Sequence, residues 1–245
     1  MRLFKQMFEK QAGGEDERGM VTNGGFNFEP ASRGESMLQF INWVKTYSTL
    51  TPSNIFEVGA NMAQDAEALR AGFVLQPQAV WVFEPHPKLF NYITETYNFN
   101  AFDYAIADRN GRMKMNLIDP TKNSNSGISS LRTHKDVPKD NFTRANVQVM
   151  RMDKFLELHD IEKIDFMKLD VEGYNYEVLE GFGDKIEVVQ SLHVEAEHYE
   201  HWEGEKLWGD IRALLEPHME MVFFERHFTQ SDSFWIKKEH IKANQ

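Results

Sequence analysis

The sequence contains no cysteine, which excludes disulfide bonds, thiolate metal sites and cysteine nucleophiles. It also has no continuous apolar run as long as a signal peptide or a membrane-spanning helix, so we expect a cytoplasmic protein without a membrane span. Basic residues are outnumbered, because 27 Lys and Arg stand against 38 Asp and Glu, and the formal net charge is −11. Nucleic acids and anionic membranes repel such a chain at long range, so neither is expected as a partner.

Hydrophobic residues are plentiful enough for one large core. They make up 41% of the 245 residues, and aromatic residues make up 13%. This composition is typical of a globular protein, and the length fits one α/β domain. Residues 1–33 are rich in Gly, Asn and charge, so we expect a flexible or accessory N-terminal segment there and a single domain over residues 34–245. The oligomeric state is left open by the sequence.

Short apolar runs alternate with helical patterns along most of the chain. Strands are expected over residues 54–59, 79–85, 102–108, 164–173 and 186–198, and helices over residues 34–50, 63–72, 86–98, 152–159, 174–182 and 205–217. Such alternation is typical of right-handed crossovers between parallel strands, and residues 219–238 have the pattern of a final hairpin. Two more strands are expected near residues 113–118 and 147–150. The long polar loop between them includes residues 121–130 and is a candidate cover for a binding site.

The segment NIFEVGANMAQDAEAL, residues 54–69, joins an expected strand to an expected helix at a glycine. Ligands of open α/β sheets bind at the carboxyl ends of strands, most often at the first strand-to-helix turn. Gly59 has no β-carbon to keep a ligand from the backbone, and Asn61 offers donors and an acceptor. Glu84 ends the next strand, where a carboxylate can accept hydrogen bonds from both ribose hydroxyls of an adenosine. A tight turn that binds nothing remains the alternative for the glycine corner alone.

Two adenosine-containing cofactors compete for this corner. A dinucleotide site prefers the pattern GxGxxG, so that the pyrophosphate can approach the helix, but the corner here reads GANMA. Glu57 would repel a pyrophosphate, whereas a carboxylate can pair with the amino group of a methionine moiety and tolerates a sulfonium. The corner therefore favours S-adenosylmethionine, and an NAD-linked oxidoreductase is the alternative.

Six motifs resemble, in this order, those of FkbM-type S-adenosylmethionine-dependent methyltransferases: FEVGAN, VFEPHPKLF, YAIADRNG, NSGISSL, MDKF and IDFMKLDVEGYNYEVLEGF. The resemblance spans about residues 55–182, and its most specific part is DFMKLDVEG followed by EVLEG. It implies the class I methyltransferase (Rossmann-like) fold, a three-layer α/β sandwich whose seven-stranded, mostly parallel sheet ends in an antiparallel hairpin. Known members are mostly O-methyltransferases of sugars or secondary metabolites, so the resemblance implies a small-molecule or glycan acceptor.

The resemblance also implies a set of residues that bind the cofactor. They are Glu57, Gly59, Ala60 and Asn61 at the methionine part, Glu84 and Pro85 at the ribose, Ala105 and Ile106 at the adenine, and Asp170 at the tip of the fourth strand, facing the methionine part or the acceptor. Ala63 stands where the family commonly has a glycine or a similarly small residue, which leaves the backbone path of the corner open.

An alcohol hydroxyl is hardly ionised at neutral pH, so a general base or a metal ion should assist its in-line attack on the methyl group. His198, near the tip of the fifth strand, is the candidate base, with Glu195 beside it. Glu172 is a candidate to orient that base or to stabilise the start of the following helix. Asp170, Glu195 and His198 together could hold Mg²⁺, although the spacing does not require a metal. A noncatalytic module that binds S-adenosylmethionine is the remaining alternative.

Overall fold

The computed structural model describes residues 35–118 and 127–242. The N-terminal segment predicted over residues 1–33 lies outside these residues, and so does the first part of the polar loop predicted over residues 121–130.

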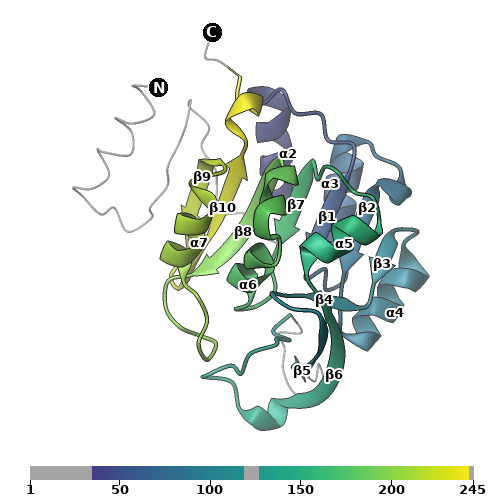
Figure 1. Ribbon diagram of the computed structural model, residues 1–245, viewed down its shortest axis with the longest axis vertical. Helices are drawn as coiled ribbons and strands as arrows, with labels where there is room; N and C mark the ends of the chain where they lie inside the picture. Colours follow the sequence, from purple (N-terminus) through teal and green to yellow (C-terminus); the bar gives the residue numbers. More distant parts are fainter. Residues whose placement is uncertain (1–34, 119–126, 243–245) are drawn as a thin grey trace, which may run out of the picture.

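The larger of two sheets has seven strands in the order β3-β2-β1-β7-β8-β10-β9 (Figure 1). These strands are β1 (Ile55–Val58), β2 (Val80–Phe83), β3 (Asn100–Phe102), β7 (Phe166–Leu169), β8 (Ser191–Glu197), β9 (Glu220–Arg226) and β10 (Gln230–Ile236). Neighbouring strands pair in parallel, except that β10 is antiparallel to both β8 and β9. The strand order reverses between β1 and β7, which is the place where open α/β sheets bind ligands.

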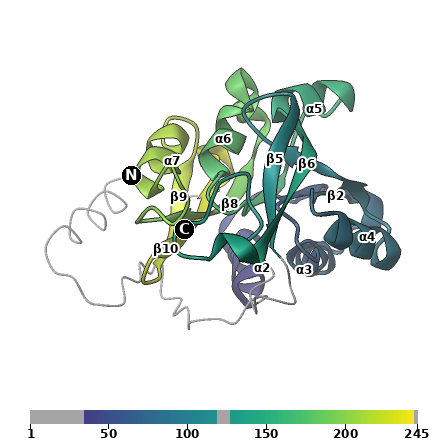
Figure 2. The same ribbon diagram turned by 90° about the horizontal axis from the view of Figure 1, so that it is seen from below.

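Helices cover both faces of this sheet (Figure 2). One face carries α2 (Glu35–Tyr47), α3 (Gln64–Phe73) and α4 (Pro87–Thr96), and the other carries α5 (Met152–Leu158), α6 (Asn175–Glu180) and α7 (Trp208–Leu215). Short 3-10 helices occupy Pro77–Ala79, Lys139–Asn141, Gly183–Val188 and Lys238–His240. The predicted α/β sandwich of the class I methyltransferase type, with its antiparallel hairpin, is confirmed. Over the described ranges, no helix combines the length and the apolar character needed to cross a membrane.

Side chains alternate between the two faces of the sheet, and each face packs against its own helices. Under α2 the buried sheet residues include Ile55, Phe166, Phe223, Phe234 and Ile236. Under α5, α6 and α7 they include Phe56, Met167, Leu192 and Trp235. On the α2 face, the residues closer to the carboxyl ends of the parallel strands are polar. Glu57, Lys168 and His193 lie side by side there, in one row across β1, β7 and β8. The core therefore gives way to a polar region at the edge where ligands bind.

The third strand was predicted as one element over residues 102–108, and this prediction is wrong. The main sheet keeps β3 only to Phe102, and β4 (Tyr104–Ile106) turns away to join a second sheet. That sheet has the order β4-β6-β5, with β5 (Gly111–Ile118) and β6 (Phe142–Met150), and lies at the bottom of Figure 1. β4 pairs in parallel with the end of β6. It therefore belongs to the sheet formed by the insertion between β4 and α5 and not to the main sheet.

The helix α3 does not end at Gly72 as predicted. It continues to Phe73, and Val74 follows in the left-handed conformation with φ of 60°. Gly72 lies instead where α3 packs against α2, because a β-carbon at this position would be 2.4 Å from Cδ1 of Ile41. The glycine permits the contact between the two helices and does not terminate one of them.

We predict that Phe234→Ala destabilises the protein by about 3–5 kcal/mol, the usual effect of removing a large ring from a packed core. Phe234 is fully buried, and its ring lies 5.3 Å from that of Trp43, 5.5 Å from Phe40 and 5.9 Å from Phe166. Chemical denaturation measures the change. The matched control is Phe228→Ala, whose side chain is 93% exposed and whose loss should change the free energy of unfolding by less than about 0.5 kcal/mol. Equal effects of the two substitutions would contradict the described packing.

Candidate active site

Two cavities meet at the carboxyl ends of β1 and β7. The first, here the corner pocket, is lined by Gly59, Asn61, Glu84, Pro85, Ala105, Ile106, Asp170, Glu172 and Tyr174, among others. The second, here the polar cleft, is wider and extends over the carboxyl end of β8 and the ends of β9 and β10 that lie beside it. Five residues line both cavities, Gly59, Asn61, Gly127, Asp170 and Glu172, so the corner pocket and the polar cleft adjoin along a shared edge.

Gly59 allows the turns after β1 and β7 to touch. Its φ is 84°, and a β-carbon there would lie 1.9 Å from the carbonyl oxygen of Asp170. The N–H groups of Gly59 and Ala60 both donate to the carbonyl of Phe83 at 3.1 Å, which ties the corner to the end of β2. The sequence indicated a glycine that admits a ligand, and the structure adds that the protein's own backbone already requires it.

The rest of the corner is held in an unusual conformation. Asn61 and Ala63 have φ of 50° and 55°, which non-glycine residues adopt at a cost of about 1–3 kcal/mol each. Ala63 is fully buried immediately before α3, so the site favours a small side chain there. The Oδ1 atom of Asn61 is buried, and within the described residues it has no hydrogen-bond partner. Backbone strain and an unsatisfied acceptor are typical of a functional turn.

Glu84 is buried beside this corner with both carboxylate oxygens engaged. Oε2 accepts a hydrogen bond from the N–H of Asn61 at 2.7 Å, and Oε1 accepts one from the N–H of His86 at 2.8 Å. Burial raises the pKa of Glu84 to about 7, and the two N–H groups only partly oppose that rise. Each oxygen keeps a lone pair that can accept a further hydrogen bond.

The structure thus brings seven of the nine predicted cofactor-binding residues to one pocket. They are Gly59, Asn61, Glu84, Pro85, Ala105, Ile106 and Asp170. The other two, Glu57 and Ala60, line only the polar cleft. Glu57 is 1% exposed, and its Oε2 accepts a hydrogen bond from the N–H of Ala66 at 3.0 Å in the first turn of α3.

Lys168 joins the acids of the site, and the sequence patterns did not indicate it. Its Nζ lies 2.9 Å from Asp65, 3.1 Å from Asp170 and 3.7 Å from Glu57. Burial alone would lower the pKa of Lys168, but the three carboxylates hold it well above its usual range. Burial likewise raises the pKa of Glu57 to about 8, although Lys168 opposes this rise. The sequence did contain one signal for this residue. Lys168 is the single charged residue in the apolar run FMKL, and a buried charge requires a partner.

A carboxylate held by two histidines lies in the polar cleft. Nε2 of His193 is 2.9 Å from one oxygen of Asp232, and Nε2 of His227 is 3.0 Å from the other. Burial would raise the pKa of Asp232, but the two histidines beside its carboxylate hold it well below its usual range. The hydrogen bond to Asp232 raises the pKa of His227. Asp232 and His227 were not among the predicted site residues, because their proximity to β8 depends on the pairing of the final hairpin.

The predicted position of His198 beside Glu195 is wrong. Glu195 lines the polar cleft, but His198 lies on the opposite face, where its ring is 6.5 Å from Trp208 and 6.3 Å from Phe224. Side chains alternate between the two faces of a strand, so residues an odd number of positions apart lie on opposite faces. His198 comes three positions after Glu195. Burial lowers the pKa of His198.

The same geometry separates the predicted magnesium ligands, since His198 points away from Asp170 and Glu195. Over residues 35–118 and 127–242, no group of three His, Asp or Glu side chains is placed to hold a metal ion.

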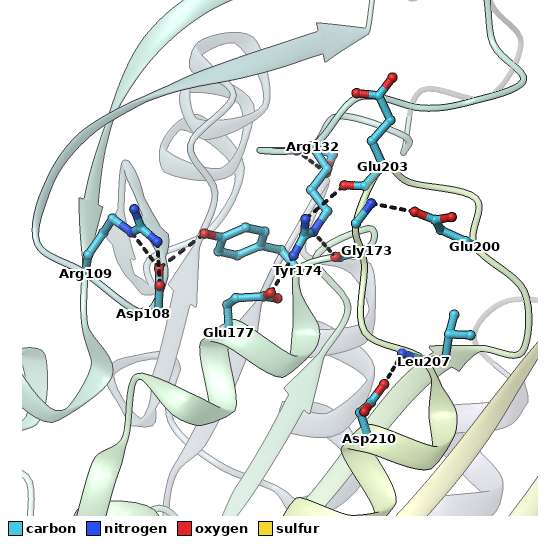
Figure 3. A network of polar contacts seen from close by, with 12 residues as sticks. Asp108, Arg109, Arg132, Gly173, Tyr174, Glu177, Glu200, Glu203, Leu207 and Asp210 are labelled. Carbon is cyan, nitrogen blue, oxygen red and sulfur yellow. Dashed lines mark hydrogen bonds and ion pairs between the residues drawn. The ribbon is translucent and has the colours of Figure 1, made fainter.

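Arg132 fixes the turn that carries Glu172 (Figure 3). Its Nε donates to the carbonyl of Gly173 at 2.9 Å, its Nη1 donates to that of Glu203 at 2.9 Å, and its Nη2 pairs with Glu177. Glu172 has a φ of 50°, and its carbonyl accepts a hydrogen bond from Ser130 at 2.6 Å. The loop after residue 126 is therefore tied to the edge that both cavities share.

Comparison with known proteins agrees with the predicted family. The methyltransferase FkbM domain matches residues 57–236. The chain is 26% identical over 182 residues to the 2-O-methyltransferase NoeI of Sinorhizobium fredii (strain NBRC 101917 / NGR234), across 69% of this chain and 72% of NoeI.

Two solved structures are also similar. Methyltransferase FkbM from Methylobacillus flagellatus KT has a TM-score of 0.47 and 15% identity, over 76% of this chain but 44% of its own length. TrmK of M. capricolum, in complex with S-adenosyl-homocysteine, has a TM-score of 0.42 and 10% identity, over 88% of this chain and 72% of its own. The chain thus spans less than half the length of the Methylobacillus protein.

We predict that stability falls as pH rises from about 5 to 7 in the ligand-free protein, partly through Glu84. The folded protein holds a proton at Glu84 until about pH 7, whereas the unfolded chain releases it near the ordinary value of 4.5. The resulting loss of folding free energy is absent below pH 4.5 and complete above about pH 7. At about 1.4 kcal/mol per pKa unit, Glu84→Gln should remove about 3 kcal/mol of this fall.

Chemical denaturation of both proteins at several pH values from 5 to 8 measures the difference. The control is Glu95→Gln on the exposed side of α4, which should leave the dependence on pH unchanged. Parallel curves for the wild type and Glu84→Gln would contradict the raised pKa.

Proposed function

The chain belongs to the FkbM family of S-adenosylmethionine-dependent methyltransferases, and from this premise we propose that it methylates a hydroxyl group of a sugar, glycan or secondary metabolite. The observation that carries the proposal is the edge of residues shared by the two cavities. A cofactor in the corner pocket and an acceptor in the polar cleft would meet at Gly59, Asp170 and Glu172. In-line transfer needs such an arrangement, with the attacking oxygen, the methyl carbon and the sulfur in one line.

The chain's own groups fit the cofactor. The remaining lone pairs of the Glu84 carboxylate are available to ribose hydroxyls, and the unsatisfied Oδ1 of Asn61 is available to a ligand N–H group. Ala105 and Ile106 offer apolar walls in the same pocket. When bound, S-adenosylmethionine supplies an electrophilic methyl group. The protein's contribution is to position the acceptor and to accept its proton.

His227 is the group we propose as the base. Its side chain is 44% exposed and lines the polar cleft, while Asp232 holds its Nε2 and leaves Nδ1 to take a proton. His193 shares the same carboxylate, but its side chain is only 4% exposed, so an acceptor reaches it less easily. Glu172, on the shared edge, is placed to contact the acceptor rather than to orient His198.

Transfer to oxygen is supported by NoeI, whose name describes a 2-O-methyltransferase. The alternative of an NAD-linked oxidoreductase has little support, because Asn61 stands where a dinucleotide site has a second glycine and Glu57 would repel a pyrophosphate. The family membership does not exclude a chain that binds the cofactor without transferring the methyl group, so turnover has to be measured as well as binding.

We predict that S-adenosylhomocysteine and S-adenosylmethionine stabilise the protein against thermal unfolding, and that NAD does not. A ligand at about one hundred times its dissociation constant adds about 2.7 kcal/mol if it binds only the folded form. Transfer of a labelled methyl group to a panel of sugars, followed by identification of the O-methyl product, tests the acceptor class. Stabilisation by NAD alone would refute the cofactor, and stabilisation by both adenosyl compounds without transfer to any hydroxyl would indicate a binding module.

We predict that His227→Gln lowers kcat by about 10²–10⁴-fold, the usual contribution of a general base, and leaves the affinity for S-adenosylhomocysteine unchanged. The control is His218→Gln, at an exposed ion pair with Glu187 outside the cleft, which should keep full turnover. The earlier hypothesis that His198 is the base is tested beside it with His198→Ala. A greater loss of kcat in His198→Ala than in His227→Gln would contradict the assignment made from the geometry.

A further inference from the structure

Three carboxylates form a row on the cleft side of the main sheet. Glu195 of β8 is the partner of Asp232 on β10, and Asp232 is the partner of Glu225 on β9. All three line the polar cleft. Like charges directly opposite one another on neighbouring strands destabilise a sheet, so the row is unfavourable unless its charge is compensated. His193 and His227 compensate Asp232, and the charge of His227 also partly opposes the rise that burial causes in the pKa of Glu225.

Acids are the largest charged influences on Glu195. Asp170, Asp232, Glu172 and Glu197 all act on its carboxylate. Burial raises the pKa of Glu195 well above its usual range, and these four acids raise it further. Lys168 is the single Lys or Arg that lines the cleft among the described residues, and its ammonium is already shared by Glu57, Asp65 and Asp170.

Glu197 provides a second and independent observation. It is only 6% exposed, yet it lines the cleft two positions further along β8. In the described part of the chain, its carboxylate forms no ion pair, and the hydrogen bond that lowers its pKa comes from its own backbone. Burial and the nearby Glu205 raise the pKa of Glu197 to about 7. A buried carboxylate without a partner is costly, so this position is suited to a cationic ligand.

We propose that the methyl acceptor carries a protonated amine in addition to its hydroxyl, and that Glu195 and Glu197 bind this ammonium group. The inference rests on the proposed function, because it describes the acceptor of that same reaction. The two side chains point from the same face of β8, about 7 Å apart along the strand. A primary ammonium has three N–H donors and is compact enough to lie between them.

The pair would also decide which acceptors are rejected. A neutral sugar of the same shape leaves both carboxylates desolvated without a counter-charge, whereas an amino sugar supplies that charge. An acetylated amine loses its charge and gains bulk, so it should bind poorly. Amino sugars are therefore the acceptor class that we assign to the cleft.

The experiment is a calorimetric titration of the full chain saturated with S-adenosylhomocysteine, which lacks the cationic sulfonium of the methyl donor. The probes are glucose derivatives with an amine at C3 or C6, each compared with its N-acetyl form, at pH 8 and with EDTA present. At this pH Glu197 is largely ionised, and the amine at C6 keeps more of its proton than the amine at C3, because only one neighbouring carbon carries an electron-withdrawing oxygen at C6 whereas two do at C3. We expect at least one amino sugar to bind tenfold or more tightly than its N-acetyl form. Failure of both amino sugars to do so overturns the proposal.

Two variants test whether Glu195 and Glu197 cause the preference for amino sugars over their N-acetyl forms. Glu195→Gln and Glu197→Gln should each remove most of it, while the affinity for S-adenosylhomocysteine, measured on the same samples, stays unchanged and reports correct folding. The control is Glu216→Gln, which removes an exposed carboxylate paired with Arg212 on the far side of α7 and should keep the full preference. A preference that survives in both cleft variants overturns the proposal.

Because the titration measures binding and not turnover, the two proposals fail separately. Preferential binding of amino sugars without methylation of any sugar would refute the proposed function and leave the ammonium site in place. Preferential binding and methylation of neutral sugars would refute the ammonium site and leave the proposed function in place.

Discussion

Both cavities depend on the contact between Gly59 and the backbone carbonyl of Asp170. This contact lets the turn after β1 lie directly against the turn after β7, since a β-carbon would overlap that oxygen. The N–H of Asp170 donates to the carbonyl of Val58 at 3.0 Å, which extends the pairing of the two strands into the turns. With the turns in this position, the N–H of Asn61 reaches Glu84 on one side, and the Asp170 carboxylate reaches Lys168 on the other. The corner pocket and the polar cleft are therefore separate cavities because the turns after β1 and β7 approach each other so closely.

The charges of the site fall into two groups with different compensation. Glu57, Asp65 and Asp170 share one buried lysine, and Asp232 is shared by two histidines. In the first group the three acids hold the pKa of Lys168 well above its usual range, so the lysine keeps its charge, while burial raises the pKa of Glu57 to about 8. In the second group the hydrogen bond to Asp232 raises the pKa of His227. The site therefore has a cation held by acids beside the corner pocket and an acid held by histidines near the hairpin.

Much of this arrangement could be predicted from the sequence, and the parts that could not have physical reasons. The alternation of strands and helices gave the layers, and the strand ends gave Gly59, Asn61 and Glu84, because carboxyl ends of parallel strands meet at one edge. Lys168 escaped notice since its partners are distant in sequence, on β1 and α3. Asp232 and His227 became site residues only through the antiparallel pairing of β10 with β8. His198 was misplaced because its nearness to the tip of the strand was taken to bring it into the cleft, whereas a residue three positions after Glu195 lies on the opposite face.

Arg132 joins segments that are far apart along the chain, with 41 residues to Gly173, 45 to Glu177 and 71 to Glu203. These contacts join the loop after residue 126 to the turn after β7 and to the segment around Glu203. Regions held by a few polar contacts exchange their amide hydrogens at lower free energy than a packed core, so this wall is expected to open before the main sheet does when the protein fluctuates. The shared edge of the two cavities is then the part of the site that local opening first exposes to solvent.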